Sequence, residues 1–261
     1  MTGRMDRTEQ LSLFETAPDA GDKAGTAAAG AEDGQAVSGV TQTPGLQWER
    51  REGTGAPDGG TDPPDPGGGV GSLEDLAGLA RQCRRCGLRL GCRGVVFGEG
   101  DPRADILFLG EGPGAVEDEL GRPFVGPAGQ LLDKILLAVG FRREEVYITN
   151  TVLCRPPDNR PPFPDEVAAC RVWLDRRLAL IDPAIIVCLG ASAAQSLLGR
   201  DLRITRDRGR WYMFGRAKVM PTFHPAALLR DPSKKRDVWQ DMKAVRAEWE
   251  TLRDRRLDPA R

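Results

Sequence analysis

The sequence predicts an α/β fold with three layers, in which helices cover both faces of a central, mostly parallel, four-stranded sheet. Four short apolar runs have the length and composition of buried strands. Longer segments with apolar residues at helical spacing lie between them, and this alternation is typical of a parallel sheet. Glycine, asparagine or histidine follows each apolar run, so each expected strand has a defined end.

The first half of the folded part is expected to contain two helices and two strands. Ser72 is a suitable N-cap for a helix that extends to about residue 82. The apolar run at 105–109 forms a strand, which stops in Gly-Glu-Gly-Pro-Gly because no regular structure continues through that sequence. A proline opens a helix at 127–139 with one apolar face, and the aromatic and β-branched residues of 146–149 form the second strand.

The second half repeats this alternation. A proline opens a helix at 164–181, and the sequence Ala-Ile-Ile-Val-Cys-Leu at 184–189 forms the third strand. A glycine then leads into a short helix at 191–198. The fourth strand is expected at 219–223 and the last helix at 233–252.

The ends of the four strands predict where a ligand binds. They fall at Gly110, Asn150, Gly190 and His224, and the carboxyl ends of parallel strands share one edge of a sheet, where open α/β sheets bind ligands. The glycine-rich loop after the first strand continues into three acids at 117–119, expected to lie in a loop. The chain contains one histidine, so His224 is the sole candidate for chemistry that needs an imidazole.

Composition divides the chain into an acidic segment and a basic domain. Residues 1–72 hold 15 of the 32 glycines and 12 acids against 5 bases, so we expect a disordered tail. Residues 73–256 form one domain, followed by a C-terminal tail at 257–261. The part after residue 72 has 32 bases and 26 acids, which weakly favours a polyanionic partner.

The sequence also predicts the compartment. It lacks a run of about 18 apolar residues and the apolar core of a signal peptide, so we expect a cytoplasmic monomer without membrane contact. All 6 cysteines lie in the folded part, where a reducing compartment favours metal ligands or free thiols over disulfides.

Four of the cysteines have a spacing that suits a metal. Cys83 and Cys86 form a C-x-x-C pair, and Cys154 and Cys170 are separated by 15 residues. An iron–sulfur cluster and structural zinc both take four thiolates, and unconnected free thiols are the third alternative. Cys92 and Cys188 are left out of the predicted set, Cys188 because it lies within an apolar strand.

The expected tail carries one short motif. The residues Gln10, Leu11, Ser12, Leu13 and Phe14 resemble the pentapeptide by which bacterial DNA enzymes dock on the sliding clamp. Leu13 and Phe14 would enter an apolar pocket and Gln10 would add a directional hydrogen bond. Five-residue matches also arise by chance, so this partner is a hypothesis.

Several motifs occur together and in order in the folded part. They are GEGPG with two acids after it, GRPFVGPAG, VYITN, CRPPDNR with a later cysteine, and TFHPAALLR. Together, over roughly residues 80–245, they resemble the iron–sulfur uracil-DNA glycosylases called family 4. The resemblance implies a uracil-DNA glycosylase-like fold and a 4Fe–4S cluster held by Cys83, Cys86, Cys154 and Cys170.

The resemblance also implies an activity, the hydrolysis of the N-glycosidic bond of deoxyuridine in DNA after the base is flipped out. Phe124 would stack on the uracil, Asn150 would bind its edge, and His224 would stabilise the leaving group. Backbone groups of the loop containing Gly110, Gly112 and Gly114 would join them.

The attacking water has no obvious partner in this sequence. The best-known glycosylases of the superfamily place an aspartate where this chain has Gly112. Glu117 is therefore favoured as the pocket carboxylate, and Glu111 as a structural or water-orienting group. A relative that bonds covalently to its product does so through a histidine that this chain lacks, so we expect a multiple-turnover hydrolase.

Contacts to DNA are expected from a loop at 224–230. Leu228 or Leu229 would fill the gap left by the flipped base and Arg230 would touch phosphate, although either leucine could instead begin a buried face. Basic residues at 206–210 and 234–236 are further candidates for phosphate contacts. The alternatives to this enzyme are a non-catalytic iron–sulfur module that binds nucleic acid and a glycosylase with a shifted base preference.

Overall fold

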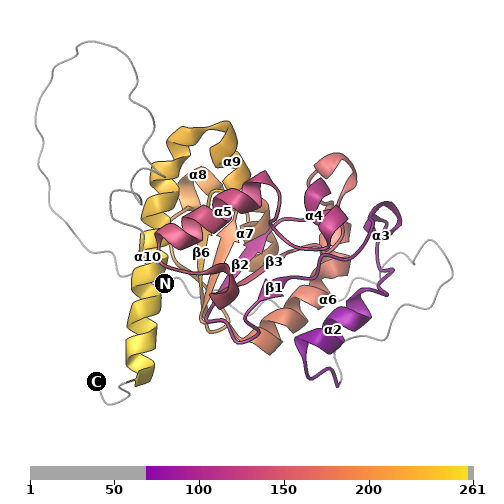
Figure 1. The fold of residues 1–261 in the computed structure, drawn as a ribbon, viewed down its shortest axis with the longest axis horizontal. Coiled ribbons are helices and arrows are strands. Elements are labelled where there is room, and N and C mark those ends of the chain that lie inside the picture. The colour runs from indigo at the N-terminus through magenta and orange to yellow at the C-terminus, as the bar shows by residue number, and fades with distance from the viewer. Residues whose placement is uncertain (1–68, 258–261) are drawn as a thin grey trace, which may run out of the picture.

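The computed structural model describes residues 69–257, which form a six-stranded sheet between two layers of helices (Figure 1). The strand order is β1-β3-β2-β4-β6-β5. The strands are β1 (Glu99–Gly100), β2 (Ile106–Gly110), β3 (Tyr147–Asn150), β4 (Ile185–Leu189), β5 (Tyr212–Phe214) and β6 (Ala217–Thr222).

The four central strands are parallel, as predicted, whereas the expected number of four strands is wrong. The strands β1 and β5 are short antiparallel edges that pair with β3 and β6. At two and three residues, they are too short to carry a periodic pattern. Gly215, with a φ of 56°, makes the tight turn between β5 and β6.

Both faces of the sheet are buried, which confirms the three-layer architecture. Ile106 and Phe108 of β2 belong to one core and Leu107 and Leu109 to the other, because successive side chains of a strand point to opposite faces. The first core packs against α5 (Pro127–Ala138), α9 (Pro225–Arg230) and α10 (Lys235–Leu257). The second packs against α6 (Pro164–Ile181) and α7 (Ala191–Leu198).

A third apolar cluster lies at the end of the molecule away from α10 (Figure 1). It joins α2 (Leu73–Ala80) and α3 (Leu88–Gly91) to α6 and to the segment after β3. Five of the cysteines belong to this region: Cys154 and Cys170 lie within the cluster, and Cys83, Cys86 and Cys92 pack against it.

Two segments expected as loops are helices. The acids at 117–119 lie in α4 (Ala115–Leu120), and residues 225–230 form α9. Both helices are six residues long, which is too short for a clear helical period. The remaining short elements are α8 (Ile204–Asp207), η1 (Arg143–Glu145), η2 (Pro157–Asn159) and η3 (Pro232–Lys234).

The clamp-like motif at 10–14, the expected tail up to residue 68 and residues 258–261 lie outside the described residues. The last helix, α10, extends to Leu257, five residues beyond its predicted end. In the part of the chain that the structure describes, none of the helices combines the length and the apolar character that a membrane span requires.

Candidate active site

The ends of the four parallel strands meet at one edge of the sheet, as predicted. Gly110 is in register with Asn150, and Leu189 at the end of β4 is in register with Thr222 at the end of β6. The Gly190 backbone has a φ of 97°, and a Cβ at that position would lie 3.4 Å from the Cβ of His224. Segments distant in sequence therefore bring their polar side chains to one place.

Gly110, Phe124 and Asn150 enclose a tight space at this edge. A Cβ on Gly110 would lie 2.3 Å from Asn150 Oδ1 and 2.5 Å from Phe124 Cζ, closer than real atoms approach. Asn150 is 1% exposed, and its Oδ1 has no hydrogen-bond partner among residues 69–257. A buried, unsatisfied amide oxygen is costly, and this one is free to accept a hydrogen bond.

Phe124 has a strained backbone, and the side chains of Arg143 and Glu117 hold the loop around it. Its φ is 51°, a left-handed conformation that is uncommon for a residue other than glycine. Arg143 donates to the carbonyls of Pro123 and Phe124, the latter at 3.1 Å. Gly129 permits the close approach of α5, because a Cβ there would lie 1.9 Å from the Phe124 carbonyl oxygen.

Glu117 supports the same loop from its amide side. Its Oε1 accepts hydrogen bonds from Val125 N at 3.0 Å and Gly126 N at 2.8 Å. The other oxygen, Oε2, would lie 2.7 Å from a Cβ at Gly114, so that glycine leaves room for the carboxylate. Glu117 thus has at least one oxygen committed to shaping the loop.

Glu111 and Gly112 differ from Glu117 in their surroundings. The Glu111 side chain makes no hydrogen bond or ion pair to the residues that the structure describes, although its carbonyl accepts from Thr151 Oγ1 at 2.5 Å. Gly112 faces Val152, whose Cγ2 would lie 2.9 Å from an added Cβ. Position 112 therefore has little room for a carboxylate.

His224 lies beside Phe124 in a fixed ring orientation. The two ring centroids are 5.6 Å apart, with 32° between the ring planes. The residue is the N-cap of α9, and its Nδ1 accepts a hydrogen bond from Ala226 N at 3.1 Å. An accepting Nδ1 places the proton of the neutral ring on Nε2, which is then a donor.

Burial, followed by the positive charge of Arg230, lowers the pKa of His224 to about 4, while Glu117 acts in the opposite direction. The imidazole is therefore neutral at physiological pH. Between its ordinary pKa of 6.5 and about 4, the unfolded chain binds the proton more readily, so stability falls as the pH falls through this window.

We expect the C–H resonances of this one histidine to titrate near pH 4 by NMR. The chain holds no other histidine, so the signal needs no assignment by mutation. Any activity that depends on the neutral ring should show no loss from imidazole protonation between pH 8 and pH 6. A midpoint near 6.5 would mean that the ring is exposed.

The three residues expected to contact DNA differ in their exposure to solvent. Leu228 is 1% exposed and packs in the core under α9, so its predicted role as a DNA wedge is wrong. Leu229 is 51% exposed, and Arg230 is exposed in the last turn of the same helix. The structure thus leaves Leu229 and Arg230 at the surface of α9, the helix that His224 caps.

Several basic candidates for phosphate contacts are engaged within the protein. Arg206 pairs with Asp207, Arg208 pairs with Asp241, and Lys234 pairs with Asp231. These pairs reduce the positive charge that the two basic segments present to a polyanion.

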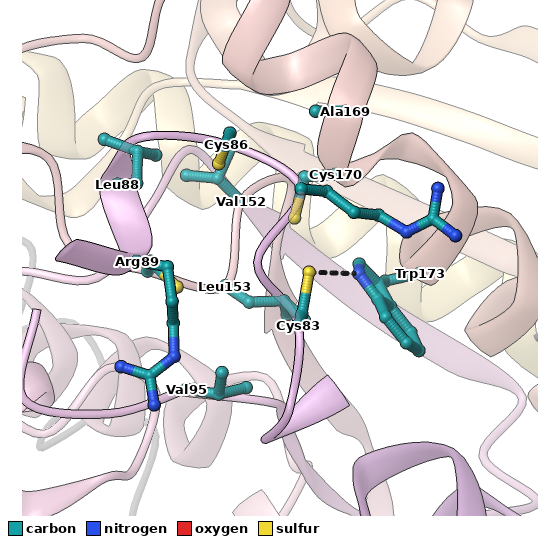
Figure 2. Close-up of a pocket in the computed structure, with 12 residues that line it drawn as sticks. Cys83, Cys86, Leu88, Arg89, Val95, Val152, Leu153, Ala169, Cys170 and Trp173 are labelled. Carbon is teal, nitrogen blue, oxygen red and sulfur yellow. Dashed lines mark hydrogen bonds between the residues drawn. The ribbon is translucent and has the colours of Figure 1, made fainter. Parts of the chain in front are cut away.

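The four predicted cysteine ligands line one pocket (Figure 2). The pocket is otherwise largely apolar and includes Trp173, whose Nε1 donates to Cys83 Sγ at 3.2 Å. Burial raises the pKa of Cys86, and burial raises that of Cys170 to about 12. Without a bound cation, the thiols of Cys86 and Cys170 therefore stay protonated. In the described part of the chain, no group of three His, Cys, Asp or Glu side chains is already arranged around a metal.

Cys92, which the sequence analysis left out, lies beside the predicted set. A hydrogen bond with Cys154 lowers the pKa of Cys92 to about 7, and the same contact raises the pKa of Cys154. Its thiol also approaches the Arg89 carbonyl at 3.7 Å. Cys188 is fully buried in β4, as expected for a small apolar residue.

Comparison with known proteins identifies the family of this chain. The family model described as the uracil DNA glycosylase superfamily matches residues 97–243. A type-4 uracil-DNA glycosylase from Thermotoga maritima is 45% identical over 67% of this chain and 93% of its own length. Type-4 uracil-DNA glycosylases from Archaeoglobus fulgidus and Sulfurisphaera tokodaii are 43% and 42% identical, each over 67% of this chain, covering 92% and 84% of their own lengths.

The chain therefore belongs to the type-4 family of the uracil-DNA glycosylase superfamily.

Proposed function

We propose that this chain is a uracil-DNA glycosylase, which flips uracil out of DNA and hydrolyses its N-glycosidic bond to start repair. One observation carries the proposal: an aromatic ring, an amide oxygen without a partner among the described residues and a neutral imidazole lie at the same edge of the sheet. A module that only bound nucleic acid would not need this combination.

Asn150 supplies base recognition. Its buried Oδ1 accepts from uracil N3–H, and its amide nitrogen donates to the neighbouring carbonyl oxygen O4. Cytosine presents an amino group and an unprotonated N3 at these positions. The Asn150 amide nitrogen would then face another donor, and Oδ1 would face another acceptor. The mismatch leaves buried groups unsatisfied, which disfavours cytosine. Phe124 contributes a flat apolar surface for the base.

His224 stabilises the departing base. Cleavage leaves negative charge on uracil, largely on its O2 and O4 oxygens, and the Nε2–H of the neutral imidazole donates to O2. The proton stays on Nε2 throughout. Because the hydrogen bond to Ala226 N holds the ring, the donor needs no reorganisation when the charge develops.

The two acids have different proposed tasks. Glu117 holds the loop that carries Phe124 and places negative charge near the sugar, where an oxocarbenium-like transition state gains positive charge. Glu111, whose side chain lacks a partner among the described residues, orients the attacking water. Gly110, Gly112 and Gly114 let the loop backbone approach the base.

The four cysteines that share a pocket are proposed to hold a 4Fe–4S cluster. Four free thiols, an apolar lining and an N–H donor at Cys83 fit such a group. When bound, the cluster supplies a rigid, negatively charged link between α2, α6 and the segment after β3. Cys83, Cys86, Cys154 and Cys170 hold it as thiolates.

The test uses oligonucleotides that contain one deoxyuridine, single- and double-stranded, with cytosine, thymine and hypoxanthine at the same position as controls. Alkali converts an abasic product to a strand break. We expect breaks on the uracil substrates and more than one turnover per enzyme. Release of hypoxanthine or mismatched thymine in preference to uracil would support a shifted specificity, and no release from any substrate would support a binding module.

A second proposal concerns the sliding clamp. Residues 10–14 match the clamp-docking pentapeptide, and we propose that this segment, with Gln10, Leu11, Leu13 and Phe14 as contacts, links the enzyme to replication in the cytoplasm. The enzyme itself is proposed to act as a monomer. Leu229 and Arg230, exposed beside His224, are its proposed DNA contacts.

Deletion of residues 9–15 should abolish binding to a purified bacterial sliding clamp, measured by surface plasmon resonance. Uracil release from short oligonucleotides should not change, because the deletion leaves the folded domain intact. Deletion of residues 35–41 is the matched control for tail length. Equal clamp binding by the two deletions would remove the motif from consideration.

A further inference from the structure

Arg177 is a buried cation without a carboxylate partner in the described part of the chain. Its side chain is fully buried in α6, at 0% exposure. The guanidinium donates to four neutral acceptors: the carbonyls of Trp173 at 3.1 Å, Phe97 at 2.7 Å and Asn150 at 3.1 Å, and the Thr149 hydroxyl. Its hydrogen bonds are therefore satisfied, but its charge is not.

The contrast with other arginines makes this arrangement unusual. Arg143, Arg160 and Arg208, which are less buried, each pair with a carboxylate. A buried cation surrounded only by neutral dipoles costs free energy, and burial accordingly lowers the pKa of Arg177. A fully buried site is where a compensating negative charge would be worth most.

The cysteine pocket lies on the same side of α6. Cys170, Trp173 and Arg177 are spaced by three and four residues, so they share one face of the helix. Trp173 donates through Nε1 to Cys83 and accepts through its carbonyl from Arg177, which places it between the two (Figure 2 shows the Trp173–Cys83 contact). Only a thiolate at Cys170 would attract the guanidinium electrostatically, because the protonated thiol carries no charge.

The other end of the guanidinium contacts the base-recognition strand. Its bonds to the Asn150 carbonyl and the Thr149 hydroxyl fix the carboxyl end of β3, where the Asn150 amide lies beside Gly110. Thr149 Oγ1 in turn donates to the Phe97 carbonyl at 2.9 Å, so the strand end, Phe97 and α6 form one network.

We propose that Arg177 is a positioning residue that takes its counter-charge from the thiolate-bound cluster and holds Asn150 in register for uracil. The proposal rests on the cluster of the proposed function. In this proposal the cluster neutralises Arg177. Its four thiolates would supply the negative charge that the described residues lack around the guanidinium. Loss of either partner would weaken the other.

The test compares Arg177→Met, which keeps the length but removes the charge and the donors, with Arg177→Lys, which keeps the charge. Arg171→Met on the same helix is the control, because Arg171 pairs with Asp175 near the surface. For each full-length protein we would measure iron per chain, bleaching of the visible cluster absorption by a chelator, the cluster reduction potential, and kcat and KM for uracil release.

Arg177→Met should lower the reduction potential and bleach about 10-fold faster, because outer residues that neutralise a metal site typically change its retention by that order. Its kcat should fall by about 10-fold with little change in KM, since a misplaced amide weakens interactions with the transition state. Arg177→Lys should restore the potential and part of kcat, and Arg171→Met should match the wild type.

Two failures remain distinguishable. Iron present with an unchanged potential and unchanged bleaching in Arg177→Met would overturn the charge coupling and leave the cluster proposal standing. Wild-type protein that releases uracil but contains no iron would overturn both the cluster and the coupling. If Arg177→Met does not fold, a potential in Arg177→Lys far from the wild-type value would contradict the proposal.

Discussion

Replacing Asn150 with aspartate should lower kcat/KM for uracil release by about 100-fold or more, the order found when one preorganised donor to a reacting group is removed. Aspartate has the same shape but turns the amide donor into an anionic oxygen. That oxygen would face uracil O4 in a site where Asn150 is 1% exposed, so repulsion adds to the lost hydrogen bond. The rate is measured under single-turnover conditions on a deoxyuridine oligonucleotide.

Gln240→Glu is the matched control, because it makes the same amide-to-acid change at an exposed position on α10. Thermal unfolding of both variants separates loss of recognition from loss of the fold. Uracil release by Asn150→Asp at the wild-type rate, with unchanged stability, would remove Asn150 from the pocket.

Adding one methyl group at Gly110 blocks the site. The Cβ of alanine would meet Asn150 Oδ1 at 2.3 Å and the Phe124 ring at 2.5 Å and 2.7 Å, so both side chains that are proposed to recognise the base must move. We expect Gly110→Ala to reduce uracil release by at least about 100-fold, because errors of about 1 Å in a reacting geometry cost that much. Overpacking should lower the free energy of unfolding by about 1–3 kcal/mol.

Gly78→Ala in α2 controls for the change of residue type. Nothing lies within 4 Å of a Cβ at that position, and alanine favours a helix, so stability should rise slightly and activity should stay. Full activity in Gly110→Ala would show that the loop relaxes and that the space enclosed by Gly110, Phe124 and Asn150 does not hold the base.

The central sheet was predictable because its strands carry strong local signals. The two central strands, β2 and β4, are uninterrupted apolar runs buried on both faces, and a glycine marks the end of each. Because parallel strands align their ends, the sequence alone could assign four strand ends to one edge of the sheet. These ends are Gly110, Asn150, Gly190 and His224. The edge strands β1 and β5 gave no such signal.

The charged supports of the site were not predictable from local patterns. Arg143 lies in a short surface helix of ordinary composition, yet it holds the Phe124 backbone across 19 residues of sequence. Arg177 occupies a helix with a mixed polar pattern and is nevertheless fully buried. Cys92 lies beside Cys154, 62 positions away, only because α3 folds against the segment after β3.

The pair Leu228 and Leu229 shows the limit most directly. Both are apolar neighbours after a histidine and a proline, and sequence offered no reason to choose between them. The fold turns Leu228 into the core and leaves Leu229 at the surface, because α9 packs one face on α5.

The sequence alone determined the strand positions, the aligned strand ends, the motifs of the family and the cysteine spacing, because each of these depends on neighbours along the chain. The burial, the hydrogen bonding and the protonation of the site residues were decided only by the tertiary structure. The unpaired Asn150 oxygen, the neutral His224 ring, the left-handed Phe124 and the buried Arg177 all arise from contacts between distant segments, because burial and hydrogen bonding depend on which groups meet in space.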